Sequence, residues 1–199
     1  VVRYRKDGQD NYGVLEGQTV KAIAGKPYER IAYTGDTVPL SEVKLLAPCE
    51  PEKIIAVGLN YLSHAKEINM EIPDVPLLFF KPPSAIINPG EPIVRPVQSA
   101  QVEYEAELAV VIKKHGKYIP QEDAQDYIFG FTCLNDVTAR DLQFIESQWA
   151  RSKGFDTFCP FGPHIETDYD YKGKQIKAVL NEEVKQDANT DDFINSVEM

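Results

Sequence analysis

The chain has 199 residues, of which 43% are hydrophobic and 26% are charged, and its formal net charge is −10. This size suits one sizeable globular unit, with room for a small additional lobe. The acidic balance excludes the basic surface that nucleic acids require, so we expect no nucleic-acid partner. No stretch approaches the roughly 18 apolar residues of a membrane-spanning helix, so we expect no membrane insertion. Three widely spaced cysteines without a C-x-x-C pair favour a reducing, cytoplasmic location.

The first 47 residues predict a small β-rich lobe. Short alternating runs at 11–15 and 19–23 are broken by glycines, which is typical of strands joined by turns. Two prolines within four residues in the segment 47–53 indicate a linker. We therefore divide the chain into a lobe over 1–47 and a larger domain over 48–199.

Strands dominate the larger domain. We expect strands at 54–58, 77–81, 108–113, 128–134 and 175–180, and helices at 61–68, 120–127 and 138–144. A doubly wound α/β fold would need longer helices between its strands. The predicted fold class is therefore mostly β (α+β), with a few helices packed outside.

Three glutamates alternate in the most informative segment, 102–112. The apolar run at its end predicts a buried strand, and alternate side chains of a strand share a face, so Glu103, Glu105 and Glu107 should point the same way. Carboxylates crowded at the mouth of a buried strand repel one another unless a cation lies between them. Oxygen ligands alone favour Mg²⁺, Mn²⁺ or Ca²⁺ over Zn²⁺. The alternative for this pattern is a solvated acidic edge.

A histidine and a glutamate follow the first strand of the larger domain. His64 and Glu67 are three residues apart, so they share a face of the predicted helix. A glutamate beside a histidine orients the imidazole and raises its basicity, which makes a general acid/base pair. An exposed helix with an ordinary ion pair is the alternative.

Two further polar residues bear on chemistry. Asp136 follows a predicted strand and is placed as another oxygen ligand, while Thr138 and Asp141 could cap the next helix. A purely structural cap is the alternative there. Lys153, in an aromatic and turn-rich segment, would be held charged if it were buried near carboxylates, and could neutralise an anionic intermediate. A surface lysine is the alternative for that position.

Taken together, these motifs resemble the fumarylacetoacetate hydrolase family. In chain order they are G-x-N-Y-x-x-H-x-x-E at 58–67, F-x-K-P at 79–82, P-G at 89–90, Y-E-x-E-L at 104–108, N-D-x-T-A-R-D-x-Q at 135–143 and K-G-F-D-T-F-x-P-x-G-P at 153–163. The segment 181–186 resembles the family's N-G-E-x-x-Q hairpin, with Glu182 where glycine is usual. The resemblance runs from about residue 53 to residue 186, and six motifs in this order make it very specific.

The resemblance implies a mixed β-roll with a few peripheral helices, a small N-terminal lobe and a homodimer. It also implies a divalent cation, Mg²⁺ or Mn²⁺ (with Ca²⁺ as an occupant in crystals), held by three carboxylates. Those carboxylates fall on Glu105, Glu107 and Asp136. Glu103 lies outside that pattern, and we expect it to support the site or to lie at the surface.

The remaining site residues are also carried over from the resemblance. The His–Glu dyad falls on His64 and Glu67, on a segment that closes over bound substrate, and the family's lysine falls on Lys153. Among the substrate-site positions, Gln143 follows the T-A-R-D motif, Arg140 supports the site from behind and Tyr61 flanks the dyad.

These residues imply enolate chemistry on a small anionic 2-oxo acid. The first hypothesis is a metal-dependent hydrolase that cleaves a C–C bond in acylpyruvate- or fumarylpyruvate-like 2,4-diketo acids through a metal-stabilised enolate. The alternative is an isomerase or decarboxylase of 2-hydroxyhepta-2,4-diene-1,7-dioate or oxaloacetate. A catalytically silent binding subunit is a third hypothesis, which the intact motifs disfavour. The dyad favours hydrolysis, because water activation requires a base.

The end of the chain departs from the family pattern. Family members continue past the 181–186 hairpin, through a helix, into a segment that carries T-G-T-P. Residues 190–199 are expected to begin that helix, so we expect the C-terminal part to be missing and the natural protein to be longer.

Overall fold

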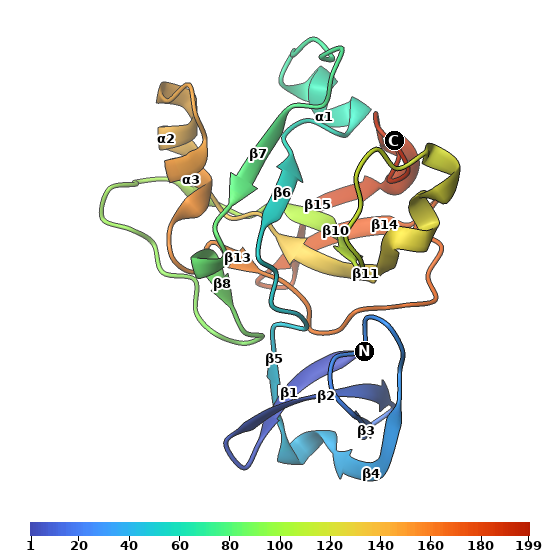
Figure 1. Cartoon of the computed structure of the whole chain (residues 1–199). Coiled ribbons are helices and arrows are strands. Elements are labelled where there is room, and N and C mark those ends of the chain that lie inside the picture. The colour runs from blue at the N-terminus through green and yellow to red at the C-terminus, as the bar shows by residue number, and fades with distance from the viewer.

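The computed structural model describes all 199 residues and is 38% strand and 17% helix, which confirms the mostly-β prediction. Its N-terminal part is one antiparallel sheet in the order β4-β3-β2-β1-β5. The strands are β1 (Val2–Lys6), β2 (Gln9–Glu16), β3 (Thr19–Ile23), β4 (Tyr33–Pro39) and β5 (Lys44–Leu46). Alternation in β1 turns Val2 and Tyr4 to one face, where they pack against Val20. This sheet lies below the rest of the chain in Figure 1.

The rest of the chain forms five strand pairs, β6–β7, β8–β13, β9–β12, β10–β11 and β14–β15, of which only β8–β13 is parallel. The strands are β6 (Ile54–Val57), β7 (Leu78–Lys81), β8 (Ile86–Ile87), β9 (Val102–Glu103), β10 (Ala106–Ile112), β11 (Ile128–Asn135), β12 (Thr138–Ala139), β13 (Cys159–Pro160), β14 (Gln175–Leu180) and β15 (Glu183–Asn189).

Three short α-helices lie at the periphery (Figure 1). They are α1 (Leu62–Glu67), α2 (Arg140–Ile145) and α3 (Ala150–Gly154). Short segments of 3₁₀-helix form η1 (Leu40–Glu42), η2 (Pro83–Ala85), η3 (Gln121–Tyr127) and η4 (Thr190–Asp192). No helix has the length and apolar character needed to cross a bilayer.

The strand predicted around the three glutamates is interrupted. β9 ends at Glu103 and β10 begins at Ala106, so the expectation that all three glutamates share one strand face was wrong. At the break the Glu105 N–H donates to Asn135 Oδ1 at 3.0 Å, and the Asp136 N–H donates to the Glu105 carbonyl at 2.8 Å. These bonds replace the regular ladder and bring Glu105 beside Asp136.

The helix predicted from residue 138 begins later, and its predicted cap is absent. Thr138 belongs to β12, and its hydroxyl lies within hydrogen-bonding distance of Glu105 Oε1 and the Asp136 carbonyl, at 3.1 and 2.9 Å. Asp141 instead accepts hydrogen bonds from Ser99 and the Ala100 N–H. The capping-box prediction was therefore wrong, because long-range partners use both side chains.

One other expectation was wrong, and one helix was not expected. The 3₁₀ turn η4 covers only Thr190–Asp192, so residues 190–199 do not begin an α-helix. The helix α3, which carries Lys153, was not expected from its aromatic and turn-rich sequence.

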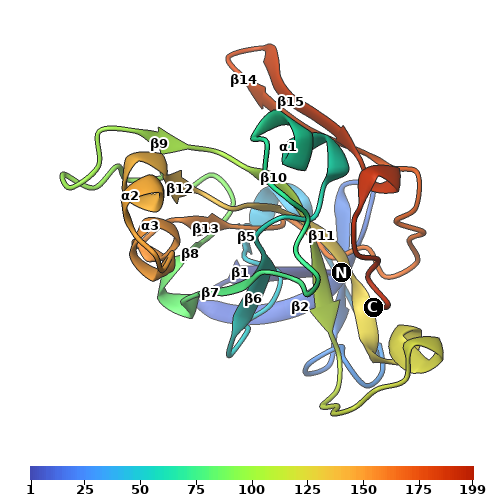
Figure 2. The ribbon, with the colours of Figure 1, turned by 90° about the horizontal axis from the view of Figure 1, so that it is seen from above.

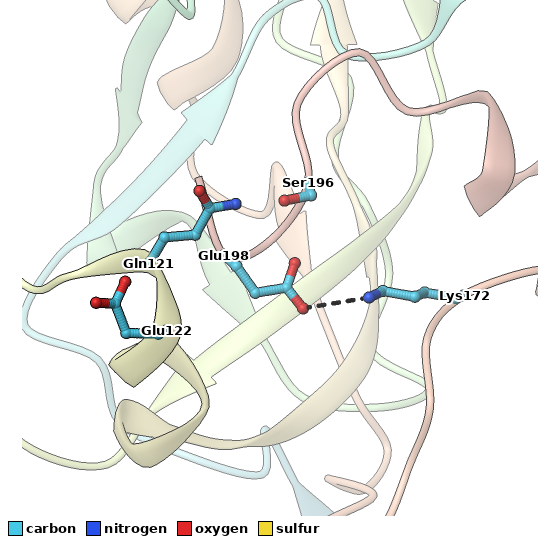
Figure 3. Close-up of a pocket in the computed structure, with 5 residues that line it drawn as sticks. All are labelled: Gln121, Glu122, Lys172, Ser196 and Glu198. Carbon is cyan, nitrogen blue, oxygen red and sulfur yellow. Dashed lines mark ion pairs between the residues drawn. The ribbon is translucent and has the colours of Figure 1, made fainter.

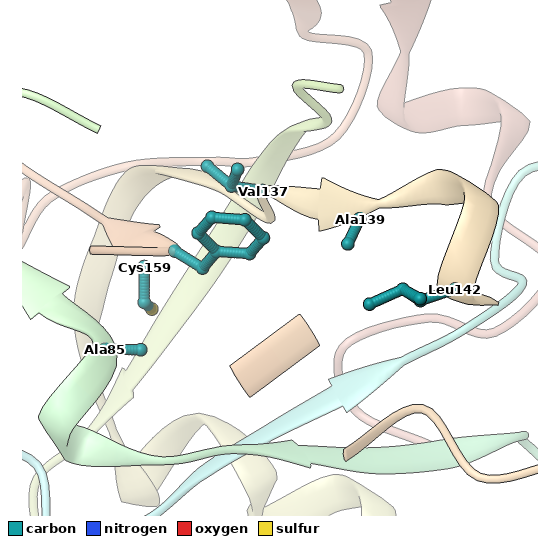
Figure 4. Close-up of a cluster of buried hydrophobic side chains, with 6 residues drawn as sticks. Ala85, Val137, Ala139, Leu142 and Cys159 are labelled. Atoms are coloured by element: carbon teal, nitrogen blue, oxygen red, sulfur yellow. The ribbon is translucent and has the colours of Figure 1, made fainter. Parts of the chain in front are cut away.

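A buried apolar cluster supports the segment around Asp136 (Figure 4). Its members come from η2, β12, α2, β13 and their flanks: Ala85, Val137, Ala139, Leu142, Phe158 and Cys159. Val137 and Ala139 alternate with Asp136 and Thr138 along the chain, so anchoring the apolar pair turns the polar pair to the opposite side. Burial of the hydrophobic side chains thus fixes the direction of Asp136.

The β14–β15 hairpin projects from the body of the molecule (Figure 2), and one glutamine ties it to β10. Gln186 Oε1 accepts a hydrogen bond from the Ala106 N–H at 2.8 Å, and Gln186 Nε2 donates to the Ala106 carbonyl at 3.0 Å. The side-chain amide therefore takes the place of a neighbouring strand at Ala106. This contact fixes the backbone between Glu105 and Glu107.

We predict that Gln186→Ala lowers the free energy of unfolding by about 1–3 kcal/mol, because it leaves both backbone groups of Ala106 without a partner. Urea denaturation measures the change. Gln175→Ala is the matched control, because Gln175 lies on the same hairpin and bonds only the exposed Asp187, and it should change stability by less than about 0.5 kcal/mol. Equal effects of the two substitutions would contradict this role for Gln186.

Candidate functional site

Asp136 lies at the centre of a buried cluster of charges. Its side chain is almost fully enclosed, and each of its oxygens accepts a hydrogen bond from a lysine ammonium group. Lys81 Nζ lies 2.5 Å from Oδ1, and Lys153 Nζ lies 2.7 Å from Oδ2. Charge-assisted bonds to both oxygens offset part of the lost hydration, but burial has the larger effect and raises the pKa of Asp136 above its usual value.

Glu105 extends this cluster. Lys153 Nζ also donates to Glu105 Oε2 at 2.6 Å, so one ammonium group bridges two of the predicted metal ligands. Arg140 Nη2 donates to Glu105 Oε1 at 2.6 Å, and its Nε donates to Glu103 Oε2 at 2.8 Å. Burial raises the pKa of Glu105, but Lys153 and Arg140 outweigh it and hold the pKa below its usual value.

Lys81 was not predicted as a site residue, although it belongs to the F-x-K-P motif. It ends β7, where strand alternation puts it on the inner face with Phe79, and it is 1% exposed. Besides Asp136, its ammonium group donates to the carbonyls of Val137 and Lys153, at 3.3 and 2.6 Å. The sequence did contain a signal for this role, namely a lysine on the inward face of an apolar strand. A charged side chain is almost never buried there unless it is paired with other groups.

Glu107 differs from the other acids because its carboxylate receives no hydrogen bond or ion pair from the chain. Burial raises its pKa to about 8, with further contributions from the charges of Glu105 and Asp136. Glu107 is half-buried, and a carboxylate that is partly withdrawn from water beside two others, with no cation of its own, is costly in its charged form. This environment suits an external cation.

Lys153 joins two of the predicted ligands, Glu105 and Asp136, and the charges of both contribute to the raised pKa of Glu107. Their oxygens are not gathered around a single point, and no cluster of three or more His, Cys, Asp or Glu side chains has the arrangement of a ready ligand set. The donor chemistry fits a hard divalent cation, because all three groups are carboxylates and Glu107 is unpaired. To bind it, Glu105 Oε2 and Asp136 Oδ2 would have to release Lys153.

The predicted His–Glu pair forms on α1. His64 Nδ1 lies 3.1 Å from Glu67 Oε2, and both side chains are exposed. Two contacts hold this segment against the C-terminal residues: Asn60 exchanges hydrogen bonds with Asn195, and Ser63 bonds Asp192. No hydrogen bond or ion pair joins the dyad to the carboxylate cluster.

The predicted substrate residues lie in two places. Tyr61 is 8% exposed, and its hydroxyl is buried without a hydrogen-bond partner; burial, and then the charge of Glu107, raise its pKa. Gln143 lies on α2, where its Oε1 accepts a hydrogen bond from Arg140 Nη1 at 2.5 Å. Arg140 therefore joins Gln143 to the carboxylate cluster, whereas Tyr61 approaches from the side of Glu107.

Two surface depressions of about 480 and 470 Å³ contain none of the predicted site residues. The first is lined by polar side chains around the Lys172–Glu198 ion pair, which spans 3.8 Å (Figure 3). The lining residues of the second include Tyr169, Tyr171, Lys172 and Glu198. The residues predicted from the motifs therefore lie outside these depressions, in the buried cluster and on α1.

Comparison with known proteins identifies the family. Residues 53–199 match the model of the fumarylacetoacetate (FAA) hydrolase C-terminal domain, and residues 1–48 match an Rv2993c-like N-terminal domain. The chain therefore belongs to the fumarylacetoacetate hydrolase family, and the resemblance seen in its motifs is confirmed.

Relatives with related sequences occur in archaea, bacteria and eukaryotes. An uncharacterized protein of Methanocaldococcus jannaschii is 52% identical over 163 residues, which are 82% of this chain and 66% of the relative. The human mitochondrial oxaloacetate tautomerase FAHD2A is 43% identical over 189 residues, which are 92% of this chain and 59% of the relative. The chain spans between 51% and 69% of the lengths of curated relatives such as these.

Solved structures confirm the fold. A 5-carboxymethyl-2-hydroxymuconate delta-isomerase from Mycobacterium smegmatis has a TM-score of 0.92 and 38% identity, and the match covers 99% of this chain and 78% of that one. A maleylpyruvate hydrolase from Sphingobium, in complex with manganese(II) and pyruvate, has a TM-score of 0.75 and 27% identity, with 98% and 80% covered. These neighbours show that the family fold hosts both isomerases and hydrolases, and that one relative binds manganese.

We predict that Lys81→Met destabilises the protein by about 3–5 kcal/mol, because it removes a cation from a buried pair and leaves two backbone carbonyls without a donor. Urea denaturation measures the loss. Lys177→Met is the control: Lys177 is exposed and only 3.7 Å from Asp187, so its loss should cost less than about 0.5 kcal/mol. A Lys81 variant as stable as that control would show that the buried contacts are not structural.

Proposed function

We propose that this protein is a divalent-metal-dependent enzyme that converts a small anionic 2-oxo acid through its enolate. We place keto–enol tautomerisation or double-bond isomerisation first. Isomerisation belongs to the sequence-based alternative, whereas tautomerisation is suggested by the names of relatives. The relatives at 37–43% identity whose names state a reaction are oxaloacetate tautomerases and hydroxymuconate-type isomerases, whereas the structures named as hydrolases are 32% and 27% identical.

The observation that carries the proposal is the unpaired Glu107 beside Glu105 and Asp136. Three carboxylates at one buried place are the donor set that Mg²⁺ or Mn²⁺ prefers. These three residues would hold the ion, which when bound would supply Lewis-acid stabilisation for charge on the substrate oxygens. A manganese-containing relative supports the same assignment.

The positive groups around the carboxylates would serve an anionic substrate. Lys153 Nζ would donate hydrogen bonds to a substrate oxygen that gains negative charge, and a buried ammonium group stabilises such charge strongly. Arg140 would hold Glu105 and Gln143 in place through the bonds described above. The Tyr61 hydroxyl, a buried donor without a partner, would bond a substrate oxygen.

His64 would move the proton. Its Nδ1 faces Glu67 Oε2 at 3.1 Å, so the proton stays on Nδ1 and Nε2 is free to accept one. In an isomerase, Nε2 would take a proton from the substrate carbon next to the carbonyl and return it to another atom. The pair lies on the exposed α1, so this role requires α1 to close toward the carboxylates with substrate bound.

Hydrolysis of a C–C bond in a 2,4-diketo acid is the second candidate, and the same dyad favours it. With Glu67 orienting the imidazole, His64 Nε2 would take a proton from water, which then attacks the distal carbonyl. Hydrolysis and isomerisation therefore share Lys153 and the enolate and differ in whether water reaches the base.

We also propose the homodimer and the cytoplasmic location that the family resemblance implied. One face of the β6–β7 pair supports self-association, because the cross-strand pairs Ile55–Phe80 and Val57–Leu78 leave four large apolar side chains exposed.

We predict that Glu107→Gln abolishes Mn²⁺ binding, because it removes one ligand charge while keeping the shape of the side chain. Isothermal titration calorimetry with MnCl₂ measures this. Glu103→Gln is the matched control and should bind Mn²⁺ normally, since Glu103 pairs with Arg140 outside the ligand set. Undiminished binding by the Glu107 variant would refute its assignment as a ligand.

An ultraviolet assay with three substrates tests the reaction: oxaloacetate, a 2-hydroxy-2,4-dienedioate and an acylpyruvate, each with Mg²⁺. We predict faster conversion of the first two, loss of activity with EDTA and its recovery with Mg²⁺ or Mn²⁺. Cleavage of the acylpyruvate alone would favour hydrolysis, and no conversion of any substrate would contradict the enolate proposal.

In the same assay His64→Ala should slow the reaction by roughly 10²–10⁴ while leaving Mn²⁺ binding unchanged, because only the proton transfer is lost. Lys66→Ala, on the same helix, is its control and should keep the rate. Full activity of the His64 variant would exclude His64 as the base.

A further inference from the structure

Two lysines share Asp136, but their surroundings differ. The ammonium group of Lys81 donates to one carboxylate oxygen and two backbone carbonyls, so its three protons are all used. The ammonium group of Lys153 contacts only carboxylates, those of Glu105 and Asp136, and otherwise lies 5.1 Å from the centre of the Phe79 ring. Lys81 is therefore built into the framework, whereas Lys153 is held only by groups that the proposed function assigns to a cation.

We propose that Lys153 is an exchangeable counterion of the metal ligands, and that Lys81 is the fixed one. Lys153 gives up Glu105 Oε2 and Asp136 Oδ2 when a divalent cation binds, and its freed ammonium group then turns to the anionic substrate. Lys81 keeps Asp136 and the backbone of α3 in place throughout. This inference rests on the proposed metal-dependent function and adds an order of events to it.

The charges of the cluster support the exchange. Four carboxylates and three cations lie together: Glu103, Glu105, Glu107 and Asp136 with Lys81, Lys153 and Arg140. With every group charged, one net negative charge remains, which is too little to balance a divalent ion. A cation on the oxygens that Lys153 bridges would also repel the ammonium group at close range. The repulsion falls if Lys153 leaves those oxygens as the cation arrives.

The contacts of Lys81 explain how the side chain of Lys153 can move while its backbone stays. Lys81 Nζ donates to the Lys153 carbonyl at 2.6 Å, so α3 is tied to β7 by its main chain. Only the side chain of Lys153 has to swing, and no bond in the framework breaks. Binding of the cation would then prepare the site for an anion, because a positive group becomes free next to the ligands.

Mn²⁺ binding to the purified protein tests the exchange without measuring activity. Electron paramagnetic resonance of free Mn²⁺ gives the dissociation constant for the wild type, Lys153→Met and the surface control Lys177→Met. We expect Lys153→Met to bind Mn²⁺ at least about tenfold more tightly than the wild type, because the competing and repelling charge is gone. The control should bind as the wild type does. Equal or weaker binding by Lys153→Met would overturn the exchange.

A second measurement uses the unaltered protein, in case the methionine variant does not fold. NMR detects the ammonium groups of buried lysines, whose protons exchange slowly when hydrogen-bonded, and Lys153→Arg assigns the Lys153 signal. We expect saturating Mg²⁺ to shift or broaden the Lys153 signal and to leave that of Lys81 in place. An unchanged Lys153 signal, or equal shifts of the Lys153 and Lys81 signals, would contradict the proposal that Lys153 exchanges while Lys81 stays fixed.

The same titrations separate this inference from the proposed function. If the wild type binds Mn²⁺ and Glu107→Gln does not, the ligand set is correct, and the Lys153 results alone decide the exchange. If neither the wild type nor Lys153→Met binds Mn²⁺, the metal-dependent function and the exchange fail together.

Discussion

The site depends on one electrostatic constraint: Asp136 is buried as a carboxylate and must be compensated on both oxygens. Lys81 and Lys153 supply that compensation from β7 and α3, two elements that lie far apart in the sequence. The apolar cluster behind Val137 fixes the direction of Asp136, and the strand break at Glu105 brings a second carboxylate to Lys153. Replacing any one of these charges leaves another uncompensated, so the ion pairs specify the arrangement more than they add net stability.

Local patterns in the sequence predicted much of the fold, and long-range contacts account for what they missed. Periodicity located the strands near 54–57, 128–135 and 175–180, because alternation and β-branched runs are local signals. The break after Glu103 was missed because it depends on the side chain of Asn135. Thr138 and Asp141 formed a plausible capping box, yet Glu105 and Ser99 engage them instead. Propensity gives no information about such partners.

The site was predicted unevenly for the same reason. The motifs named Glu105, Asp136 and Lys153, which do lie together, and named His64 with Glu67, which do bond. They gave no role to Lys81, whose importance comes from partners 55 and 72 residues away. That the ammonium group of Lys153 bridges two expected ligands could be seen only in three dimensions. The choice among tautomerisation, isomerisation and hydrolysis depends on what α1 and the substrate do together.

The central claim is that Glu105, Glu107 and Asp136 hold one hard cation. Anomalous X-ray scattering from crystals grown with Mn²⁺ tests it most directly. We expect a single strong peak within about 2.0–2.6 Å of an oxygen from each of the three carboxylates. A peak elsewhere with Glu105 and Asp136 still bound to Lys153, or no peak at saturating Mn²⁺, would contradict it.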